Sequence, residues 1–392
     1  MTTSEALAVG LSLPGLAYGL WALYAMVRTN AAVPHLGEPV PSDARHARVS
    51  LIIAARDEEP DLEPALRQRL RDPDPDLEFV LVNDRSRDRT GAIMDALAGE
   101  DPRVKVVHLT ELPEGWLGKV HAMQRGLEVS TGAWLLFTDA DIHFRVGTVR
   151  LALEAALREG CDHVTVLPVF ERTSPGVDLL YGPFLRWLVV FGRLWKVRDP
   201  SSRAAVGGGL FNFVSRAALE RTQGLPWLRL EVGDDVALGQ MLKRAGGRPG
   251  VFKATGLVSL QMYPSMRVMG RAMEKAALPI LGRFHLSVLF ATGFTLLLVE
   301  VVPFVLCAVA PAGLARALGG VASALLLTAA AAEARWCQRP WLATLAVPLG
   351  TAIMVAMTLA AGVKTWLRGE ITWRDTRYSL KALREGQRLE FL

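Results

Sequence analysis

Hydrophobic and polar residues divide the chain into two apolar end regions and a mixed middle region. Residues 6–27 carry no charge over 22 positions, close to the ~20 apolar residues with which a helix crosses a bilayer. Near the other end, residues 286–315 contain one charged side chain, and residues 341–363 contain none. Residues 317–332 are also uncharged but cover only 16 positions. We therefore predict an N-terminal span and a C-terminal hydrophobic region with two spans and a short third candidate.

The first segment is predicted to be a retained membrane anchor, residues 1–30, rather than a cleaved signal peptide. Signal peptides begin with a positively charged region, but no Lys or Arg precedes residue 6, and Arg28 follows the apolar stretch. Positive residues favour the cytosolic side of a span. We therefore expect a multi-pass protein of the cell membrane whose middle region lies in the cytosol.

Between the apolar ends, residues 48–278 alternate short apolar runs with polar helical stretches. The apolar runs predict strands at residues 49–55, 77–83, 104–109, 134–138 and 163–170. The stretches between them predict helices at residues 60–71, 90–98, 118–130 and 147–159. The runs are nearly continuous in Val, Ile and Leu, which is typical of strands covered on both faces. Strands that alternate with helices predict an α/β domain with a mostly parallel sheet.

Acidic residues follow three of the predicted strands. Asp57 and Glu58 come after the first strand, Asp84 after the second, and Asp139 and Asp141 after the fourth. Parallel α/β sheets bind their ligands at the carboxyl ends of the strands. Because these acids are distant in the sequence but share one edge of the predicted sheet, we predict a binding site at that edge.

Asp139 and Asp141 are the candidate metal ligands. Side chains two positions apart on an extended segment point to the same face, so both carboxylates could approach one ion. Oxygen ligands suit Mg²⁺ or Mn²⁺, and Mg²⁺ is commonly held by one or two carboxylates together with water and substrate phosphates. Two solvated aspartates at a strand end are the alternative. His143 is either a further ligand or a surface histidine.

Charges at three further places are not explained by helix capping alone. Asp84 lies at the strand tip, before the residues that would cap the following helix. Lys119 lies near a predicted helix N-terminus, where anions are preferred, so a bound phosphate would explain it. Asp234 and Asp235 begin a predicted amphipathic helix, and capping explains one of the two.

The order of these motifs resembles that of a known family. The segments are IIAARDEE, VLVNDRSRDRT, LGKVHAMQRGL, LLFTDADI, VGGGLFNFVSR and GDDVALGQMLKRAG. Together they resemble the motif series of family 2 glycosyltransferases with the GT-A fold, a Rossmann-like, mostly parallel sheet flanked by helices. The most similar members are membrane-anchored, such as the hopanoid-associated and carotenoid glycosyltransferases and ceramide glucosyltransferase.

The resemblance implies a role for each matched acid. Asp139 and Asp141 would form the metal-binding pair, with Asp139 nearer the ribose and Asp141 the main ligand. Asp84 would hydrogen-bond the nucleotide base, usually uracil. Asp235, the second acid of the pair that begins with Asp234, would be the catalytic base.

The resemblance also implies two pockets. Residues 54–58 would line the nucleotide pocket, and residues 207–210 would form the wall of the acceptor pocket, unless the glycine run is only a flexible turn. The positions concerned are Ala54, Arg56 and Glu58 in the first stretch and Gly208 and Gly209 in the second.

One motif of many relatives is missing. Processive synthases and ceramide glucosyltransferase carry a Gln/Arg-x-x-Arg-Trp motif after the base, whereas residues 261–277 contain no tryptophan. This region instead contains Arg267, Arg271 and Lys275, which would share one helical face. The three cations would hold the diphosphate or meet lipid headgroups. The missing motif argues against a processive polymerase.

The implied activity is transfer of a sugar from a nucleotide-sugar donor, a UDP-sugar by the family pattern, to a membrane lipid at the cytosolic leaflet. A base and a metal ion are sufficient for direct displacement, so we expect inversion at the anomeric carbon. A polyprenyl-phosphate sugar synthase of the same fold and a non-catalytic membrane scaffold are the alternatives. No nucleic-acid partner is expected, because the arginines behind the net charge of +5 are scattered.

The predicted topology of the C-terminal region, residues 279–366, contains a conflict. If all three apolar segments cross, the tail at residues 367–392 lies outside, yet this tail is basic and should stay inside. We favour an inside tail, with the short segment 317–332 as the one that does not span. Glu300 must face protein or water if its segment crosses the membrane.

Overall fold

The computed structural model describes residues 3–37 and 47–390 of the chain. They fall into two compact units, which we call the helical unit and the sheet unit. The helical unit comprises residues 3–32, 172–195 and 261–385, and the sheet unit comprises the rest. The first two residues of the predicted anchor and the last two of the predicted tail lie outside the described residues.

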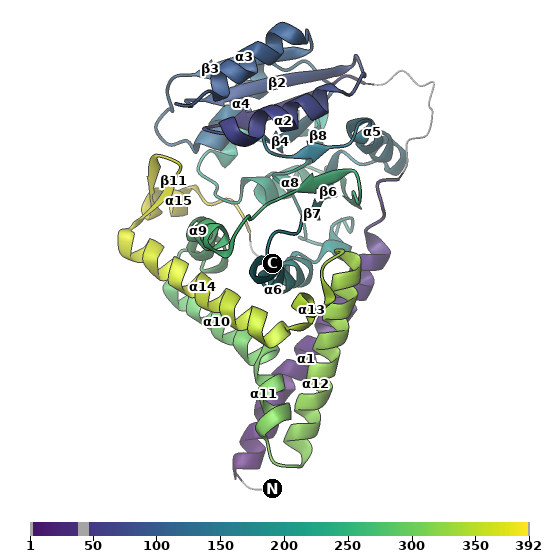
Figure 1. Ribbon diagram of the computed structural model, residues 1–392, viewed down its shortest axis with the longest axis vertical. Helices are drawn as coiled ribbons and strands as arrows, with labels where there is room; N and C mark the ends of the chain where they lie inside the picture. Colours follow the sequence, from purple (N-terminus) through teal and green to yellow (C-terminus); the bar gives the residue numbers. More distant parts are fainter. Residues whose placement is uncertain (1–2, 38–46, 391–392) are drawn as a thin grey trace. The chain divides into compact units, whose positions relative to one another are not determined.

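The sheet unit is built on a seven-stranded sheet with the strand order β3-β2-β1-β4-β8-β6-β9 (Figure 1). Its strands are β1 (Val49–Ala55), β2 (Leu77–Asp84), β3 (Val104–Leu109), β4 (Trp134–Asp139), β6 (His163–Leu167), β8 (Asn212–Ser215) and β9 (Pro249–Lys253). Neighbouring strands are parallel except where β8 pairs with β4 and β6. A second, three-stranded sheet contains β5 (His143–Phe144), β10 (Val258–Leu260) and β7 (Val169–Phe170).

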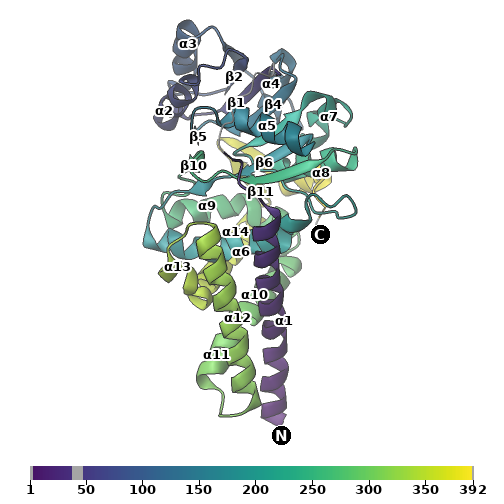
Figure 2. The ribbon, with the colours of Figure 1, turned by 90° about the vertical axis from the view of Figure 1, so that its right-hand side faces the viewer.

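Helices connect and cover the strands of the sheet unit. The longer ones are α2 (Glu59–Leu70), α3 (Thr90–Glu100), α4 (Gly118–Val129), α5 (Thr148–Glu159) and α8 (Asp234–Arg244). Two short elements, α7 (Arg216–Glu220) and η2 (Leu225–Leu228), lie between β8 and α8 in the chain. Figure 2 shows α2, α3 and α4 around β1 and β2.

The predicted α/β fold is confirmed. The first four predicted strands and the four predicted helices are present, with ends that differ by at most two residues. The fifth predicted strand, residues 163–170, divides into β6 and β7 in different sheets, because Pro168 between them lacks the N–H that a continuous ladder needs. The antiparallel strand β8 was not predicted, since its four residues give only a weak pattern.

The parallel register brings the carboxyl ends of β1, β2 and β4 to one edge of the sheet. Within β1, Ala54 is opposite Val82 on one side and opposite Asp139 on the other. Helix α4 packs directly on β1 and β2, because a Cβ at Gly126 would lie 2.5 Å from Ile52 Cγ2. Only glycine permits this approach, which fixes how closely α4 lies on the sheet.

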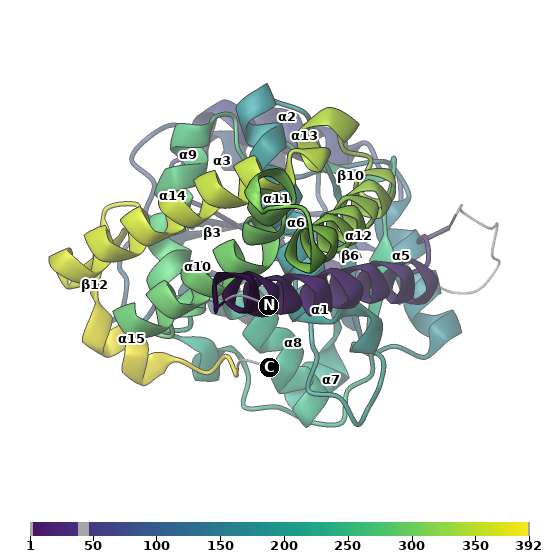
Figure 3. The ribbon, with the colours of Figure 1, turned by 90° about the horizontal axis from the view of Figure 1, so that it is seen from below.

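The helical unit contains the apolar segments. Its helices are α1 (Thr3–Ala32), α6 (Pro175–Gly192), α9 (Met266–Ala276), α10 (Leu286–Glu300), α11 (Val302–Val309), α12 (Leu314–Trp336), α13 (Trp341–Leu345), α14 (Val347–Arg368) and α15 (Leu380–Gly386). The short turns η1 (Leu194–Lys196) and η3 (Ala277–Leu281) and the hairpin β11 (Glu370–Trp373) and β12 (Thr376–Ser379) complete the elements. Figures 2 and 3 show α11 and α12 beside α1, and all three contact one another.

Three described helices, α1, α12 and α14, are long and apolar enough to cross a membrane. Helix α12 extends the short apolar stretch 317–332 to 23 residues. The longer apolar stretch 286–315 instead breaks between Glu300 and Val302, next to Pro303, into α10 and α11. Residues 266–281 and α10 form a pair bent by 102°. The length of an uncharged run therefore did not predict the length of the helix. Proline interrupts the run at residues 286–315, whereas α12 extends beyond the run at residues 317–332 to include charged residues at both ends.

Glu300 faces protein within the helical unit. Its carboxylate is completely buried and accepts hydrogen bonds from Arg186 at 2.6 and 2.9 Å and from the Tyr18 hydroxyl at 2.6 Å. Arg186 also contacts Glu333 at 3.2 Å. These residues join α1, α6, α10 and α12, so the expectation that this charge avoids lipid holds within the described helices.

The end of the described chain belongs to the sheet unit. The side-chain amide of Gln240 donates to the Glu390 carbonyl at 2.7 Å and accepts from the Glu390 N–H at 2.9 Å. The buried Glu231 carboxylate accepts the Leu389 N–H at 2.8 Å and the Arg388 N–H at 2.5 Å. Residues 386–390 therefore pack on α8 and on the loop before it, which the basic composition of the tail did not predict.

Candidate active site

The loops that follow β1 and β2 hold each other through reciprocal hydrogen bonds. The Asp57 N–H donates to Ser86 Oγ at 3.1 Å, and the Arg87 N–H donates to Asp57 Oδ1 at 2.8 Å. The Glu58 N–H donates to Thr90 Oγ1 at 2.9 Å. Asp57 itself has a left-handed backbone, with a φ of 53°. The first predicted stretch is therefore a fixed loop, and Asp57 serves to join the two loops.

The first loop contains three residues predicted to line a nucleotide pocket, Ala54, Arg56 and Glu58. Ala54 lies in β1 directly opposite Asp139, and Arg56 and Glu58 follow at the end of the strand. All three thus lie at the edge of the sheet where the acids gather. Their contacts with a nucleotide stay a prediction.

Asp84 is buried at the tip of β2 and is held by its neighbour Arg85. Both carboxylate oxygens accept from the guanidinium, at 2.7 and 3.1 Å. Helix α4 begins against this pair, because a Cβ at Gly118 would lie 2.6 Å from Asp84 Oδ2. Arg85 was not predicted from the sequence. Its backbone is left-handed, with a φ of 59°, and this conformation leaves no signal in the pattern of residues. Both oxygens of Asp84 are thus shared with Arg85, and the contact of Asp84 with a base stays a prediction.

Lys119, in the first turn of α4, is the central cation of the site. Its Nζ lies 2.8 Å from Asp139 Oδ1. Burial disfavours the charged amine, but Asp139, Asp234 and Asp235 outweigh that effect and raise the pKa of Lys119. Lys119 is therefore protonated at neutral pH.

Asp234 and Asp235 lie in the first turn of α8, where the helix dipole favours anions. The Asp235 carboxylate accepts the Val236 N–H at 2.8 Å and the Gly209 N–H at 3.0 Å. Burial raises the pKa of both carboxyl groups, that of Asp234 to about 7, while the charge of Lys119 opposes the shift. The pair is thus more basic than an exposed aspartate.

The glycine run lies between these charges. A Cβ at Gly209 would lie 3.0 Å from Lys119 Nζ, 3.4 Å from Asp139 Oδ2 and 3.8 Å from Asp235 Oδ2. Its carbonyl also accepts the Asp139 N–H at 3.2 Å. Lys119, Asp139 and Asp235 come from three distant parts of the chain and converge on this residue, so the structure brings them into one cluster.

Asp141 completes the predicted carboxylate pair. It is partly buried, and burial together with the nearby charge of Asp139 raises its pKa. A cation would relieve this repulsion, so the donor set fits a hard divalent ion. No group of three or more His, Cys, Asp or Glu side chains among residues 3–37 and 47–390 could hold a metal alone.

Of three further predicted residues, one makes a different contact and two belong to the helical unit. His143 Nδ1 lies 2.6 Å from Gln68 Oε1, and His143 does not join the carboxylates in a metal-binding group of the described chain. Arg267 and Arg271 are exposed on α9 in the helical unit. Their role toward a diphosphate or a lipid headgroup stays a prediction.

The chain resembles known glycosyltransferases. Residues 50–215 match the family described as glycosyl transferase family 2. Over 218 residues, 55% of this chain and 56% of the relative, it is 23% identical to the 4,4'-diaponeurosporenoate glycosyltransferase of Staphylococcus haemolyticus. Over 93 residues, 24% of this chain and 26% of the relative, it is 33% identical to the uncharacterized glycosyltransferase EpsJ of Bacillus subtilis. The chain thus spans about half or less of the length of these relatives.

A solved structure shares the fold over most of the chain. The mannosyltransferase PcManGT from Pyrobaculum calidifontis, in complex with GDP-Man and Mn²⁺, aligns with a TM-score of 0.57 at 20% identity. The alignment covers 93% of this chain and 99% of that one. Residues 50–215 thus match glycosyl transferase family 2, and the α/β fold with its mostly parallel central sheet is shared with this solved structure, as the motif series predicted.

The glycine run provides a test of the close packing around the site. We expect Gly207→Ala to destabilise the protein by at least the 1–3 kcal/mol typical of overpacking, because its Cβ would lie 1.7 Å from the Asp235 carbonyl oxygen. Gly208→Ala is the matched control, since that Cβ would meet only Thr165 Cγ2, at 3.4 Å. Thermal melts of both variants in detergent measure the effect, and equal melting temperatures would contradict the predicted clash.

Proposed function

We propose that this protein is an inverting, metal-dependent glycosyltransferase that moves a sugar from a nucleotide-sugar donor to a membrane lipid at the cytosolic leaflet. The observation that carries the proposal is the convergence of Lys119, Asp139 and Asp235 on Gly209. Sugar transfer needs a base for the acceptor and positive charge for the departing diphosphate. The cluster contains a candidate for each.

Asp235 is the proposed base. Two backbone N–H groups fix its carboxylate, and burial raises its pKa, which makes it a stronger proton acceptor than an exposed aspartate. In the reaction it would take the proton of the acceptor hydroxyl as the oxygen bonds the anomeric carbon from the side opposite the diphosphate. The bond to the diphosphate then breaks, and the configuration inverts.

Lys119, Asp139 and Asp141 are proposed to bind the diphosphate end of the donor. Lys119 supplies a permanent positive charge near the N-terminus of α4, where phosphates bind favourably. Asp139 and Asp141 would hold Mg²⁺ or Mn²⁺, which when bound neutralises charge on the leaving diphosphate. The Mn²⁺ and GDP-Man bound to the structural relative support a divalent ion and a nucleotide sugar. A UDP-sugar, expected from the motifs, and a GDP-sugar both belong in a test.

A lipid acceptor is proposed because the domain is joined to helices long enough to cross a membrane. An anchored domain meets a membrane-bound acceptor at a high local concentration. The name of one relative, a 4,4'-diaponeurosporenoate glycosyltransferase, also supports this class of acceptor. A polyprenyl phosphate is the alternative acceptor; it is already anionic and needs no base.

Transfer assays with a donor panel test the proposal. Purified protein with a membrane lipid extract is incubated with radiolabelled UDP- and GDP-sugars in Mn²⁺, Mg²⁺ or EDTA. We expect one donor to label a lipid, no labelling in EDTA, and a loss of about 10²–10⁴-fold in rate for Asp235→Asn.

The exposed Asp95→Asn variant is the charge-matched control and should keep full activity. Retained activity in Asp235→Asn would favour the phosphate acceptor. The enzyme proposal falls if no sugar is transferred or hydrolysed in any of these reactions.

The pH dependence of kcat/KM should reflect the raised pKa values of the buried pair Asp234 and Asp235. The base must be ionised, and the raised pKa of Asp235 means that protonation begins at a pH where an exposed aspartate is still charged. We therefore expect kcat/KM to fall as the pH drops from neutral into the mildly acidic range. Asp234→Asn removes a negative charge beside Asp235 and so should lower the pKa of Asp235. The fall of kcat/KM on the acidic side should then occur at lower pH. A profile that stays flat through this range would contradict the assignment.

We also propose that the C-terminal tail lies on the cytosolic side with the sheet unit. Residues 386–390 bond to Glu231 and Gln240 of that unit, and such bonds cannot form across a membrane. The chain between residues 261 and 385 would then cross the membrane an even number of times. This supports the inside tail without excluding α12 as a span.

Labelling of single cysteines tests this topology. In a cysteine-free background, Glu111→Cys in the sheet unit and Lys381→Cys in the tail, both at exposed positions, should resist a membrane-impermeant maleimide in intact cells. Both should react after lysis. Reaction of the Lys381→Cys variant alone in intact cells would place the tail on the opposite side and contradict the proposal.

A further inference from the structure

Helix α2 buries an arginine on its apolar face. Leu62, Ala65, Leu66 and Arg69 form the buried face of this helix, with the spacing of a core-facing stripe. The Arg69 side chain lies in the place of an aliphatic residue and is only 3% exposed. Removing a guanidinium from water costs several kcal/mol, so its hydrogen bonds must offset that cost.

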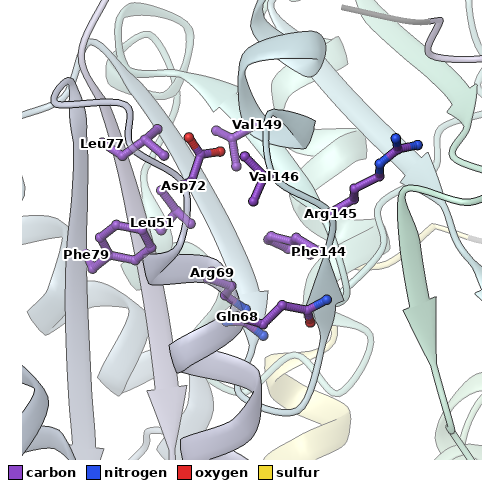
Figure 4. A pocket seen from close by; sticks show the side chains of 10 residues that line it. All are labelled: Leu51, Gln68, Arg69, Asp72, Leu77, Phe79, Phe144, Arg145, Val146 and Val149. Carbon is purple, nitrogen blue, oxygen red and sulfur yellow. The ribbon is translucent and has the colours of Figure 1, made fainter.

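Within the described residues, the hydrogen bonds of Arg69 go to the backbone of residues 139–142, which we call the carboxylate turn. Its Nη2 donates to the carbonyls of Asp139 at 3.0 Å and Ala140 at 3.2 Å, and its Nε donates to the carbonyl of Ile142 at 2.9 Å. The guanidinium also lies 4.9 Å from the centre of the Phe144 ring. Figure 4 shows Arg69 and Phe144 lining the same cavity, of about 10 Å³.

Arg69 thus hydrogen-bonds the backbone of the turn rather than the side chains that are predicted to bind the metal ion. The guanidinium is close enough for Asp139 and Asp141 to act on it, although burial lowers the pKa of Arg69 to about 10 and it stays protonated at neutral pH. The Nε and Nη2 donors are directed at three carbonyl groups, whereas the buried Nη1 has no hydrogen-bond partner among the described residues. The bonds from Nε and Nη2 hold the backbone from residue 139 to residue 142. The two side-chain carboxylates therefore receive a nearby positive charge without a hydrogen bond from Arg69 to their oxygens, although Asp139 Oδ1 pairs with Lys119.

We propose that Arg69 is the positioning residue of the metal-binding turn, and that it holds Asp139 and Asp141 in the arrangement that binds a divalent ion with a nucleoside diphosphate. The identity of the bound groups, a divalent ion and a nucleoside diphosphate, rests on the proposed function. The support of the turn by Arg69 rests on the hydrogen bonds alone, so the two parts can be tested separately.

The same helix offers a matched control. Arg67 lies two residues away, is about half exposed and pairs with Glu63 at 2.8 Å and Glu100 at 2.7 Å. Arg67→Gln therefore removes the same charge from the same helix without touching the turn. Arg69→Lys keeps the charge but loses the planar fork of donors, and Arg69→Gln loses both.

Mn²⁺ binding is measured by electron paramagnetic resonance with UDP and with GDP. We expect Arg69→Gln to weaken Mn²⁺ binding by about 10–100-fold, the usual effect of removing a residue that orients metal ligands. Arg69→Lys should recover part of this loss, and Arg67→Gln should equal the wild type. Transfer assays should show the loss mainly as a higher Mn²⁺ requirement, with kcat restored at saturating Mn²⁺.

Hydrogen exchange without metal or nucleotide provides the independent measurement. Amides of residues 138–144 should exchange faster in Arg69→Gln than in the wild type and in Arg67→Gln, while the other strands of the sheet stay protected. Unchanged exchange in this segment, or wild-type Mn²⁺ binding by Arg69→Gln, would overturn the proposal. If the wild type itself binds no Mn²⁺ with either nucleotide, the metal-dependent function fails, and the exchange data still decide the role of Arg69 in the turn.

Discussion

The site depends on one electrostatic constraint: several carboxylates share a small, partly buried space and require positive charge beside them. Asp139, Asp234 and Asp235 act together on Lys119, which stays protonated in spite of its burial. Arg69, bound to the backbone of the carboxylate turn, contributes a second cation. The two cations differ in what they bind. Lys119 pairs with a side-chain carboxylate, whereas Arg69 binds backbone carbonyls.

Close backbone approach makes this concentration of charge possible. The missing side chain of Gly118 allows Asp84 to contact the start of α4, and that of Gly126 allows α4 to lie close to the sheet. The missing side chain of Gly207 allows the first turn of α8 to contact the glycine run. At each place a Cβ would collide with a neighbouring atom. Gly207, at the start of the glycine run, is therefore required for packing, and the run is also part of the predicted acceptor wall. A flexible turn alone would not require such short separations.

The helical unit solves a related problem by a different arrangement. Glu300, Glu333 and Arg186 are fully buried and paired among helices that are otherwise apolar. A polar cluster of this kind ties together helices that apolar contacts alone would leave free to slide, because in an apolar environment a charge without its partner is costly. In the sheet unit, residues 386–390 connect the end of the chain to the loop before Asp234. The proposed base thus lies close in space to both the middle and the end of the sequence.

The sequence alone determined the α/β class, most strand and helix positions, and the gathering of acids at one sheet edge, because buried parallel strands and strand-end carboxylates leave local patterns. Motif order was sufficient to indicate the glycosyltransferase family. Only the tertiary structure decided which charges pair. Arg85 holds Asp84, Arg69 holds the carboxylate turn, and α12 rather than the 286–315 segment forms a long helix. The Arg69 contacts join residues distant in the chain, the Arg85 pair forms where the backbone of Arg85 is left-handed, and the helix lengths depend on where proline breaks a helix. None of these is encoded in the length of an apolar run or in the spacing of charges along the chain.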